Sequence, residues 1–133
     1  MRLFRQEELA MLRIVGVHKD ELAQNEFVLL QNQGHMRVTL KGHVIMSDSM
    51  VQGSNEPLWH VFSDEEAVPA GLYVLLSSGS GQPHWARTKD GAHVYHTYMN
   101  RTDSVWNHAQ LPLHVLAQQH SYSVRSEVAV SLH

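Results

Sequence analysis

The stretch WHVFSDEEAVPAGLYVLL, residues 59–76, holds the pattern that decides the fold of this chain. It contains two apolar, β-rich runs, Trp59–Phe62 and Leu72–Leu76, separated by the acidic turn Ser63–Glu66 and by the corner Pro69–Gly71. Short strands bounded by Pro, Gly and acidic clusters are typical of the middle of an all-β domain. We therefore expect the acidic turn to be solvated and to join two core strands.

Length and composition predict one folded domain. The 133 residues are enough for a single hydrophobic core, and 43% of them are hydrophobic against 17% charged. Such a chain buries enough apolar surface to fold rather than stay disordered. We expect residues 1–133 to form one domain, with a core that extends over about residues 12–124.

Charge and cysteine content narrow the classes of partner and location. A formal net charge of −3 disfavours a nucleic-acid partner, which usually meets a basic surplus, without closing that alternative. The absence of cysteine excludes disulfides, thiolate zinc sites and cysteine nucleophiles. Arg5, Glu7 and Glu8 interrupt the apolar residues of the N-terminus, and no stretch approaches the roughly 18 apolar residues of a membrane span. We therefore expect a cytoplasmic protein without a membrane span.

Further β-rich runs lie on both sides of the opening stretch. Between residues 37 and 46, Val38, Leu40, Val44 and Met46 alternate with polar residues, which is typical of one half-buried antiparallel strand. Asp90-Gly91 between two such runs predicts a hairpin. The β-rich runs, from which we expect about eight or nine strands, are Leu12–Val17, 26–31, Arg37–Met46, His84–Thr88, Ala92–Met99, Ser104–Trp106, Leu113–Ala117 and Tyr122–Leu132, besides the two in residues 59–76.

Eight or nine short strands with turns every 8–12 residues predict a two-layer antiparallel sandwich or an open barrel. Residues 4–12 would form a short N-terminal lead-in. The Gly- and Ser-rich segment 77–83 is expected to be a flexible surface loop, because no helix and no Lys-Ser/Thr pair follows it at the spacing of a phosphate-binding loop.

The order of several short motifs resembles the lamin-tail domain family. Its members show a second strand ending in Asn, a Leu-x-Gly corner, a Phe followed by an acidic turn and a Pro/Ala-Gly corner, a small-residue loop, and a Trp-Asn segment before a Val-x-Leu strand. Together the matches cover about residues 12–124. In this chain the corresponding residues are 26–34 (EFVLLQNQG), Leu40–Gly42, Phe62, Pro69–Gly71, Ser78–Gly81, Ser104–Asn107 and Leu113–Leu116.

The sequence departs from the family pattern at three places. His43 stands where the family commonly has Trp after the Gly. Ala109–Pro112 replaces a Gly-Asp pair, and Ala117–His120 replaces an Asp-x-x-Gly hairpin between the final strands. These changes bear on the register of the C-terminal strands.

The resemblance implies an immunoglobulin-like β-sandwich used for recognition, as a stand-alone member of bacterial type. Domains of this family in nuclear lamins contact proteins and are connected with DNA or chromatin, and bacterial relatives are fused to secreted or membrane-associated hydrolases. The family has no catalytic residues to carry over, so the resemblance implies neither an enzyme nor a cofactor.

Eleven histidines raise the alternative of a metal site. His93 and His96 on one strand would point to opposite faces, so a site needs histidines from several strands. A His₃ or His₂-carboxylate site would suit zinc or nickel, in a structural or hydrolytic role. No HExxH or other tight spacing supports one, and sheet-surface histidines are the plainer interpretation. The residues that could form such a site are His84, His93, His108 and His114.

Aromatic residues give the second group of candidates. Most fit core packing, since aromatics favour strands. Trp85 follows the Gly-rich segment and lies between His84 and Arg87, so it could line a partner face. No Ser lies in a G-x-S-x-G elbow, which disfavours a hydrolase. We therefore expect a non-enzymatic module that recognises a protein, a nucleic acid or a surface component, or that self-associates. Its candidate binding residues are Trp85, Arg87, Tyr95 and His96.

Overall fold

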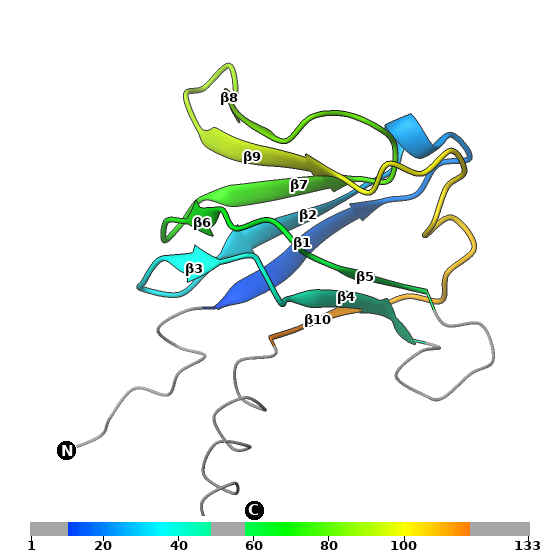
Figure 1. The fold of residues 1–133 in the computed structure, drawn as a ribbon, viewed down its shortest axis with the longest axis horizontal. Coiled ribbons are helices and arrows are strands. Elements are labelled where there is room, and N and C mark those ends of the chain that lie inside the picture. The colour runs from blue at the N-terminus through cyan, green and yellow to red at the C-terminus, as the bar shows by residue number, and fades with distance from the viewer. Residues whose placement is uncertain (1–10, 49–57, 118–133) are drawn as a thin grey trace, which may run out of the picture.

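The largest sheet of the computed structural model has five strands in the order β1-β2-β7-β9-β8 (Figure 1). The structure describes residues 11–48 and 58–117. Burial alternates along β2, where Val28 and Leu30 are fully buried and Phe27 and Leu29 are half-buried on the outer face. The strands are β1 (Leu12–His18), β2 (Phe27–Asn32), β7 (Tyr73–Ser77), β8 (His84–Arg87) and β9 (His93–Tyr98).

Two smaller sheets complete the fold. The order β10-β4-β5 forms a three-stranded sheet, and β3 pairs with β6. In Figure 1 the three-stranded sheet lies below the large one, with β3 and β6 at one end. These strands are β3 (Val38–Thr39), β4 (Val44–Ser47), β5 (Trp59–Val61), β6 (Ala67–Val68) and β10 (Leu113–Leu116).

The core lies between the layers and draws on all three sheets. Trp106 and Phe62, the largest fully buried side chains, come from segments between strands. The prediction of an all-β fold is confirmed, with ten strands in the part of the chain that the structure describes. Other members of the core cluster are Leu12, Val28, Leu30, Val38, Leu40, Ile45, Val68, Val74, Leu76, Tyr95, Val105, Ala109 and Leu113.

The single strand predicted over residues 37–46 is wrong. The chain turns at Lys41-Gly42, where Gly42 has φ 90° and its N–H donates to the Phe62 carbonyl at 3.0 Å. As a result β3 and β4 belong to different sheets. The turn also shifts the alternation, because Ile45 is fully buried in the core whereas Met46 is only half-buried.

One strand pair departs from the predicted antiparallel arrangement. β9 pairs with β7 in parallel and with β8 antiparallel. The chain leaves β7, passes the end of β9 and enters β8 at the edge of the sheet, and the predicted Asp90-Gly91 hairpin then returns it between the two. The Asp-Gly pattern predicts that β8 and β9 are joined by a hairpin. It does not predict that β9 lies beside β7.

The segment predicted as a flexible surface loop, residues 77–83, is partly buried and closely packed. Ser78 is fully buried, and its carbonyl accepts the Arg101 N–H at 2.9 Å. A Cβ on Gly79 would lie 2.7 Å from Gln24 Cα, and one on Gly81 would lie 2.6 Å from the Tyr98 ring. Glycine is required here because the loop crosses so close to its neighbours.

Residues Ser104–Trp106, predicted as a strand, form a turn held by a buried carboxylate. Glu26 is fully buried, and its Oε1 accepts the backbone N–H groups of Val105 and Trp106 at 2.7 and 2.9 Å. The Ser78 hydroxyl donates to the same oxygen at 2.6 Å. Since these N–H groups donate to a side chain, they are not available to a β-ladder.

The acidic turn of the opening stretch is only partly solvated. Glu65 is exposed, but Asp64 is half-buried. Asp64 Oδ2 accepts hydrogen bonds from the hydroxyl groups of Tyr95 and Thr97 at 2.9 and 2.8 Å. Asp64 therefore ties the segment between β5 and β6 to β9 in the opposite sheet.

The corner Pro69–Gly71 is anchored by Asn32, the last residue of β2. Its buried side-chain amide donates to the carbonyls of Met36 and Val68, each at 2.9 Å. The Asn32 carbonyl accepts the Gly71 N–H at 2.7 Å, and Gly71 has φ 85°. This one side chain joins the β2–β3 turn to β6 and the corner before β7.

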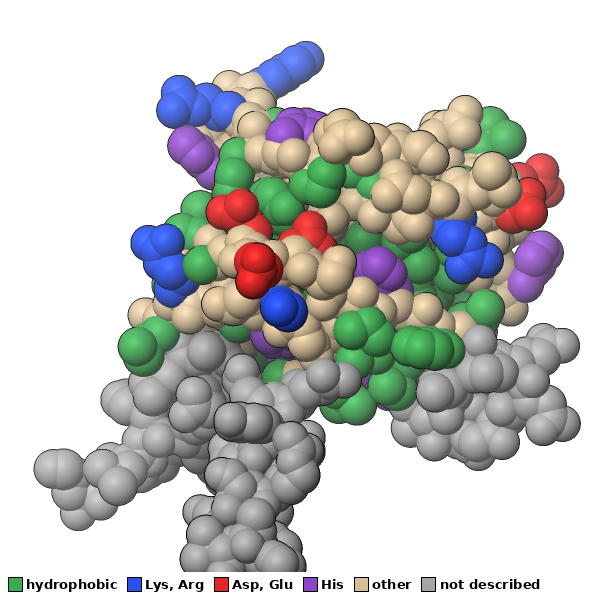
Figure 2. Space-filling view, in the orientation of Figure 1, with side chains coloured by type: hydrophobic (Ala, Val, Ile, Leu, Met, Phe, Trp, Pro, Cys, Tyr) green, Lys and Arg blue, Asp and Glu red, His purple; other side chains and the backbone are tan. Residues whose placement is uncertain are grey.

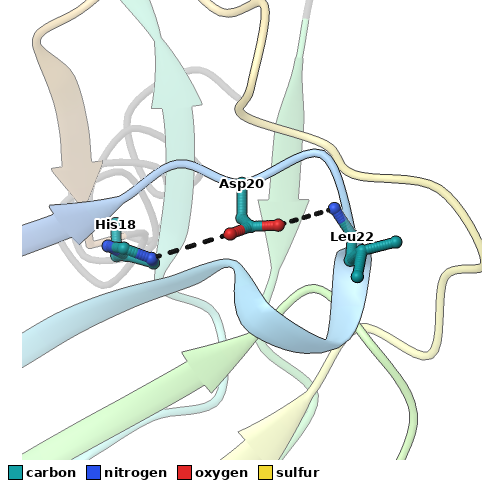
Figure 3. Close-up of polar contacts among 3 residues, drawn as sticks. All are labelled: His18, Asp20 and Leu22. Atoms are coloured by element: carbon teal, nitrogen blue, oxygen red, sulfur yellow. Dashed lines mark hydrogen bonds and ion pairs between the residues drawn. The ribbon is translucent and has the colours of Figure 1, made fainter.

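A second acidic side chain orders the turn after β1. Asp20 Oδ1 accepts the Leu22 N–H at 2.8 Å, and Oδ2 lies 3.9 Å from Nε2 of His18 (Figure 3). The 3₁₀ turn η1 (Ala23–Asn25) follows and leads into β2. The run Tyr122–Leu132 and nearly all of the predicted lead-in, residues 4–12, lie outside the described residues.

Replacing Glu26 tests the role of its carboxylate. Glu26→Ala leaves two backbone donors and a buried hydroxyl without their acceptor, so we expect it to lower the free energy of unfolding by at least about 3 kcal/mol. Glu26→Gln retains one acceptor oxygen and should cost less than half as much. Urea denaturation measures both, with Glu65→Ala as the control at an exposed carboxylate. Equal losses for Ala and Gln would contradict this role.

Candidate functional site

The four predicted binding residues lie on the β8–β9 hairpin but do not form one surface. Trp85 pairs with Tyr95, and their ring centroids are 5.3 Å apart on the side that faces the core. Arg87 lies on that same side and is exposed, with Nη2 3.4 Å from Nε2 of His93. His96 points to the opposite, outer face. The sequence pattern therefore selects four residues of one hairpin, but these residues lie on both of its faces.

Tyr95 is a core residue. Its side chain is only 5% exposed, and its hydroxyl donates to Asp64. Burial, together with the Asp64 carboxylate, raises the pKa of the Tyr95 phenol. A phenol that is kept neutral and hydrogen-bonded in this way holds the two layers together and is not available to a partner.

The outer face of the same hairpin carries a stack of rings. His84 and His96 are cross-strand neighbours with ring centroids 4.9 Å apart and an angle of 13° between their planes. Tyr98 extends the stack, 6.3 Å from His84. Partial burial and the neighbouring His84 both lower the pKa of His96. His96 is therefore uncharged around neutral pH and gains a proton only in acid.

The four histidines of the metal alternative are not brought together. His84 and His93 lie on opposite faces of the hairpin, by the register of β8 with β9. His114, on β10 in another sheet, places Nε2 2.9 Å from Oδ1 of Asp48, and exposed His108 lies in the turn after Trp106. Within residues 11–48 and 58–117, no three His, Cys, Asp or Glu side chains are grouped so that they could hold a metal ion.

The structure reveals an apolar surface that sequence reasoning missed. In the three-stranded sheet, His114, Met46 and Trp59 form one cross-strand row, and Leu116, Val44 and Val61 form the next. Directly paired residues point to the same face of an antiparallel sheet. The opposite face carries Ile45 and Val115, which belong to the core or pack on it. We call these six outward residues the Trp59 face.

Much of the Trp59 face is open to solvent although five of its six residues are apolar, and only Val44 among them is buried. Trp59 is 52% exposed and Leu116 is 54% exposed, and none of the six residues is Asp, Glu, Lys or Arg. Figure 2 shows hydrophobic side chains gathered at this side of the molecule, over β4 and β5. A half-exposed Trp on an apolar sheet face, here on the edge strand β5, is the kind of residue that often dominates protein–protein binding.

A local signal for this surface was present in the sequence. A continuous alternation from Val38 to Met46 predicts that Val44 and Met46 share the face of Val38 and Leu40. Gly42 at positive φ interrupts it, so the alternation has to be restarted after the corner. Restarted there, Val44 and Met46 fall on the face opposite to Ile45, as observed.

No protein-family model matches the sequence, and the search of curated proteins finds no match either. In the part of the chain that the structure describes, no helix is long and apolar enough to cross a membrane. The assignment of function therefore depends on the residues and surfaces described above.

The buried histidines make stability depend on pH. Burial lowers the pKa of His43 and of His60, and His96 shifts in the same direction. Below the unfolded pKa of about 6.5, the unfolded chain therefore binds more protons than the folded one. Stability is thus full above about pH 6.5 and is lost as pH falls towards the lower folded values.

We expect the free energy of unfolding to be smaller at pH 5.5 than at pH 7.5, with a shallower dependence in His43→Gln. Glutamine stays neutral and can still donate to the Leu40 carbonyl, which lies 3.1 Å from Nδ1 of His43. Exposed His108→Gln is the control and should keep the wild-type slope. Urea denaturation across this pH range measures the slopes, and identical slopes for wild type and His43→Gln would contradict the assignment.

Proposed function

We propose that this chain is a non-enzymatic interaction module that binds a protein through the Trp59 face. The observation that carries the proposal is the two-row apolar surface of β10, β4 and β5, with Trp59 and Leu116 each more than half exposed. Exposed apolar residues are common singly, but here Trp59, Val61 and Leu116 are exposed around half-buried Met46 and buried Val44, with His114 as the one polar member. The partner would present a complementary apolar surface.

The side-chain composition of the surface favours a protein partner over a nucleic acid. A sheet face of Val, Met, Trp and Leu offers dispersion contacts and few hydrogen bonds, whereas nucleic-acid binding depends on Lys and Arg at phosphates. The net charge of −3 agrees with this preference. The metal alternative has no comparable support, because no ligand group of three is found among the described residues. A cytoplasmic location is part of the same proposal.

Lamin-tail kinship, and with it an immunoglobulin-like sandwich, is also part of the proposal. It is supported by the structural roles of the residues that carry the resemblance. Asn32 anchors two turns, and Gly42 and Gly71 adopt positive φ at corners. Trp106 is fully buried with its backbone held by Glu26. Domains of such a family recognise partners without catalysis, which agrees with a binding role.

The test compares the exposed Trp59 ring with the half-buried His96 ring on a different sheet. Trp59→Ser removes the largest side chain of the Trp59 face, whereas His96→Ser removes a ring from the outer face of the five-stranded sheet. Loss of a hot-spot Trp costs about 2 kcal/mol or more, so we expect Trp59→Ser to weaken partner binding by about 30-fold. His96→Ser should bind like the wild type.

The measurement is titration of each variant with the partner captured by the wild-type chain in its own cells, and sedimentation velocity for self-association. Urea midpoints should be similar for all three proteins, because Trp59 lies outside the core cluster. Unchanged binding by Trp59→Ser, with weakened binding by His96→Ser, would move the interaction to the hairpin face and refute the proposal.

A further inference from the structure

The β8–β9 hairpin brings two histidines into contact across its strands. His84 on β8 pairs directly with His96 on β9, and directly paired residues project from the same face of an antiparallel sheet. Their ring centroids are 4.9 Å apart and the ring planes differ by 13°. The hairpin lies at the top of Figure 1, where β8 is an edge of the five-stranded sheet. Since His84 is exposed and His96 is half-buried, the pair can be reached from solvent.

The hydrogen bond that His84 makes fixes which of its nitrogens carries the hydrogen. Nδ1 of His84 lies 2.8 Å from the carbonyl oxygen of Gln82. A carbonyl oxygen only accepts, so Nδ1 is the donor, and in the neutral ring Nε2 keeps an unshared lone pair. Histidines that bind metal ions commonly have this arrangement, with one nitrogen on the ion and the other donating to a carbonyl. Nε2 of His84 is therefore set up as a metal ligand.

The side chains around the pair do not compete for its lone pairs. His96 pairs with Leu75 on β7, and His84 also stacks on Tyr98, with ring centroids 6.3 Å apart. Within the described part of the chain, neither imidazole forms an ion pair with a carboxylate, whereas His114 already does so. The two rings are thus close to each other, accessible, and not engaged by an acidic side chain.

We propose that His84 and His96 together bind a divalent transition-metal ion at the surface of the hairpin. Imidazole nitrogen suits Zn²⁺, Ni²⁺ and Cu²⁺, of which Cu²⁺ binds most tightly. Two nitrogens that each lie about 2 Å from one ion are roughly 3 Å from each other, so the two rings need only incline their tips together. Water completes the coordination shell, because among the described residues no third His, Cys, Asp or Glu is grouped with the pair.

A bound ion ties the edge strand β8 to β9, and the site goes beyond the proposed binding role. The ion stabilises the folded hairpin, because the two ligands are held side by side only when the strands pair. Two protein ligands make an open surface site and not a catalytic zinc centre, which has three. The site shares no residue with the Trp59 face, which lies on another sheet. A failure of one proposal therefore leaves the other standing.

Titration of the intact chain with Zn²⁺ alone, followed by NMR of the imidazole side chains at pH 7.5, tests the site directly. Exposed His93, on the other face of the same hairpin, serves as the lone-histidine reference. The second ligand is held beside the first, so we expect His84 and His96 to respond together at about 100-fold lower Zn²⁺ than His93. A response of His84 only at the Zn²⁺ concentration that affects His93 would overturn the proposal.

Matched substitutions test whether the two rings share one ion. In His84→Gln, the remaining His96 should need about 100-fold more Zn²⁺ for the same response, because the chelating partner is gone. His93→Gln should leave the responses of His84 and His96 unchanged. Since His84 is exposed, His84→Gln should keep the backbone amide spectrum of the folded chain, which the same experiment records. A wild-type response of His96 in folded His84→Gln would show that the rings act separately and would refute a shared ion.

Discussion

The buried carboxylate of Glu26 is the interaction on which the arrangement of the second half of the chain depends. Its Oε1 accepts hydrogen bonds from the Ser78 hydroxyl and from the Val105 and Trp106 N–H groups, all of which are distant from Glu26 in sequence. The bond from Ser78 fixes the crossing loop after β7, and those from Val105 and Trp106 fix the turn that puts Trp106 into the core. Because a buried carboxylate is costly without donors, all three contacts must form together. The position of β10 follows from this turn.

The same principle holds at the opposite end of the sandwich. Asn32 occupies the end of β2 and satisfies carbonyls of two other segments, while Glu26 lies just before the beginning of β2. The interior strand β2 thus has a buried polar anchor at each end, and the loops that reach these anchors are fixed against it. The strands themselves are held by apolar packing that tolerates many sequences. Specificity in the path of the chain comes from these two polar residues and from glycines at positive φ or at close approaches.

Features that depend on a local sequence pattern can be predicted from this sequence. Features that depend on contacts between residues far apart in the chain cannot. β1, β2, β7 and the β8–β9 hairpin are predicted to within a few residues, since alternation and Asp90-Gly91 are local signals. The parallel pairing of β7 with β9 depends on where a loop crosses, which no local pattern encodes. Likewise, Ser104–Trp106 has a strand-like composition, but its N–H groups are taken by a side chain about 80 residues away.

The predicted binding residues do not form one surface, and the reason is related. Trp85 and Tyr95 are aromatic and lie near a loop, but only the pairing of the two sheets shows that they face inward. Trp59 lies in the stretch that decides the fold, in a run that the sequence predicts to be a core strand. Its exposure follows from β5 being an edge strand whose alternate residues face out. Whether an aromatic side chain packs inside or stays outside is decided by the layer that covers it.

Function is thus assigned to a surface and not to a reactive group. The central claim, that the Trp59 face meets the partner, is tested most directly by hydroxyl-radical footprinting of the chain alone and in its partner complex. The account predicts that Met46, Trp59 and Leu116 become protected from oxidation in the complex, while His84, His96 and Tyr98 react as in the free chain. Protection of His84, His96 and Tyr98, with Trp59 unchanged, would contradict it.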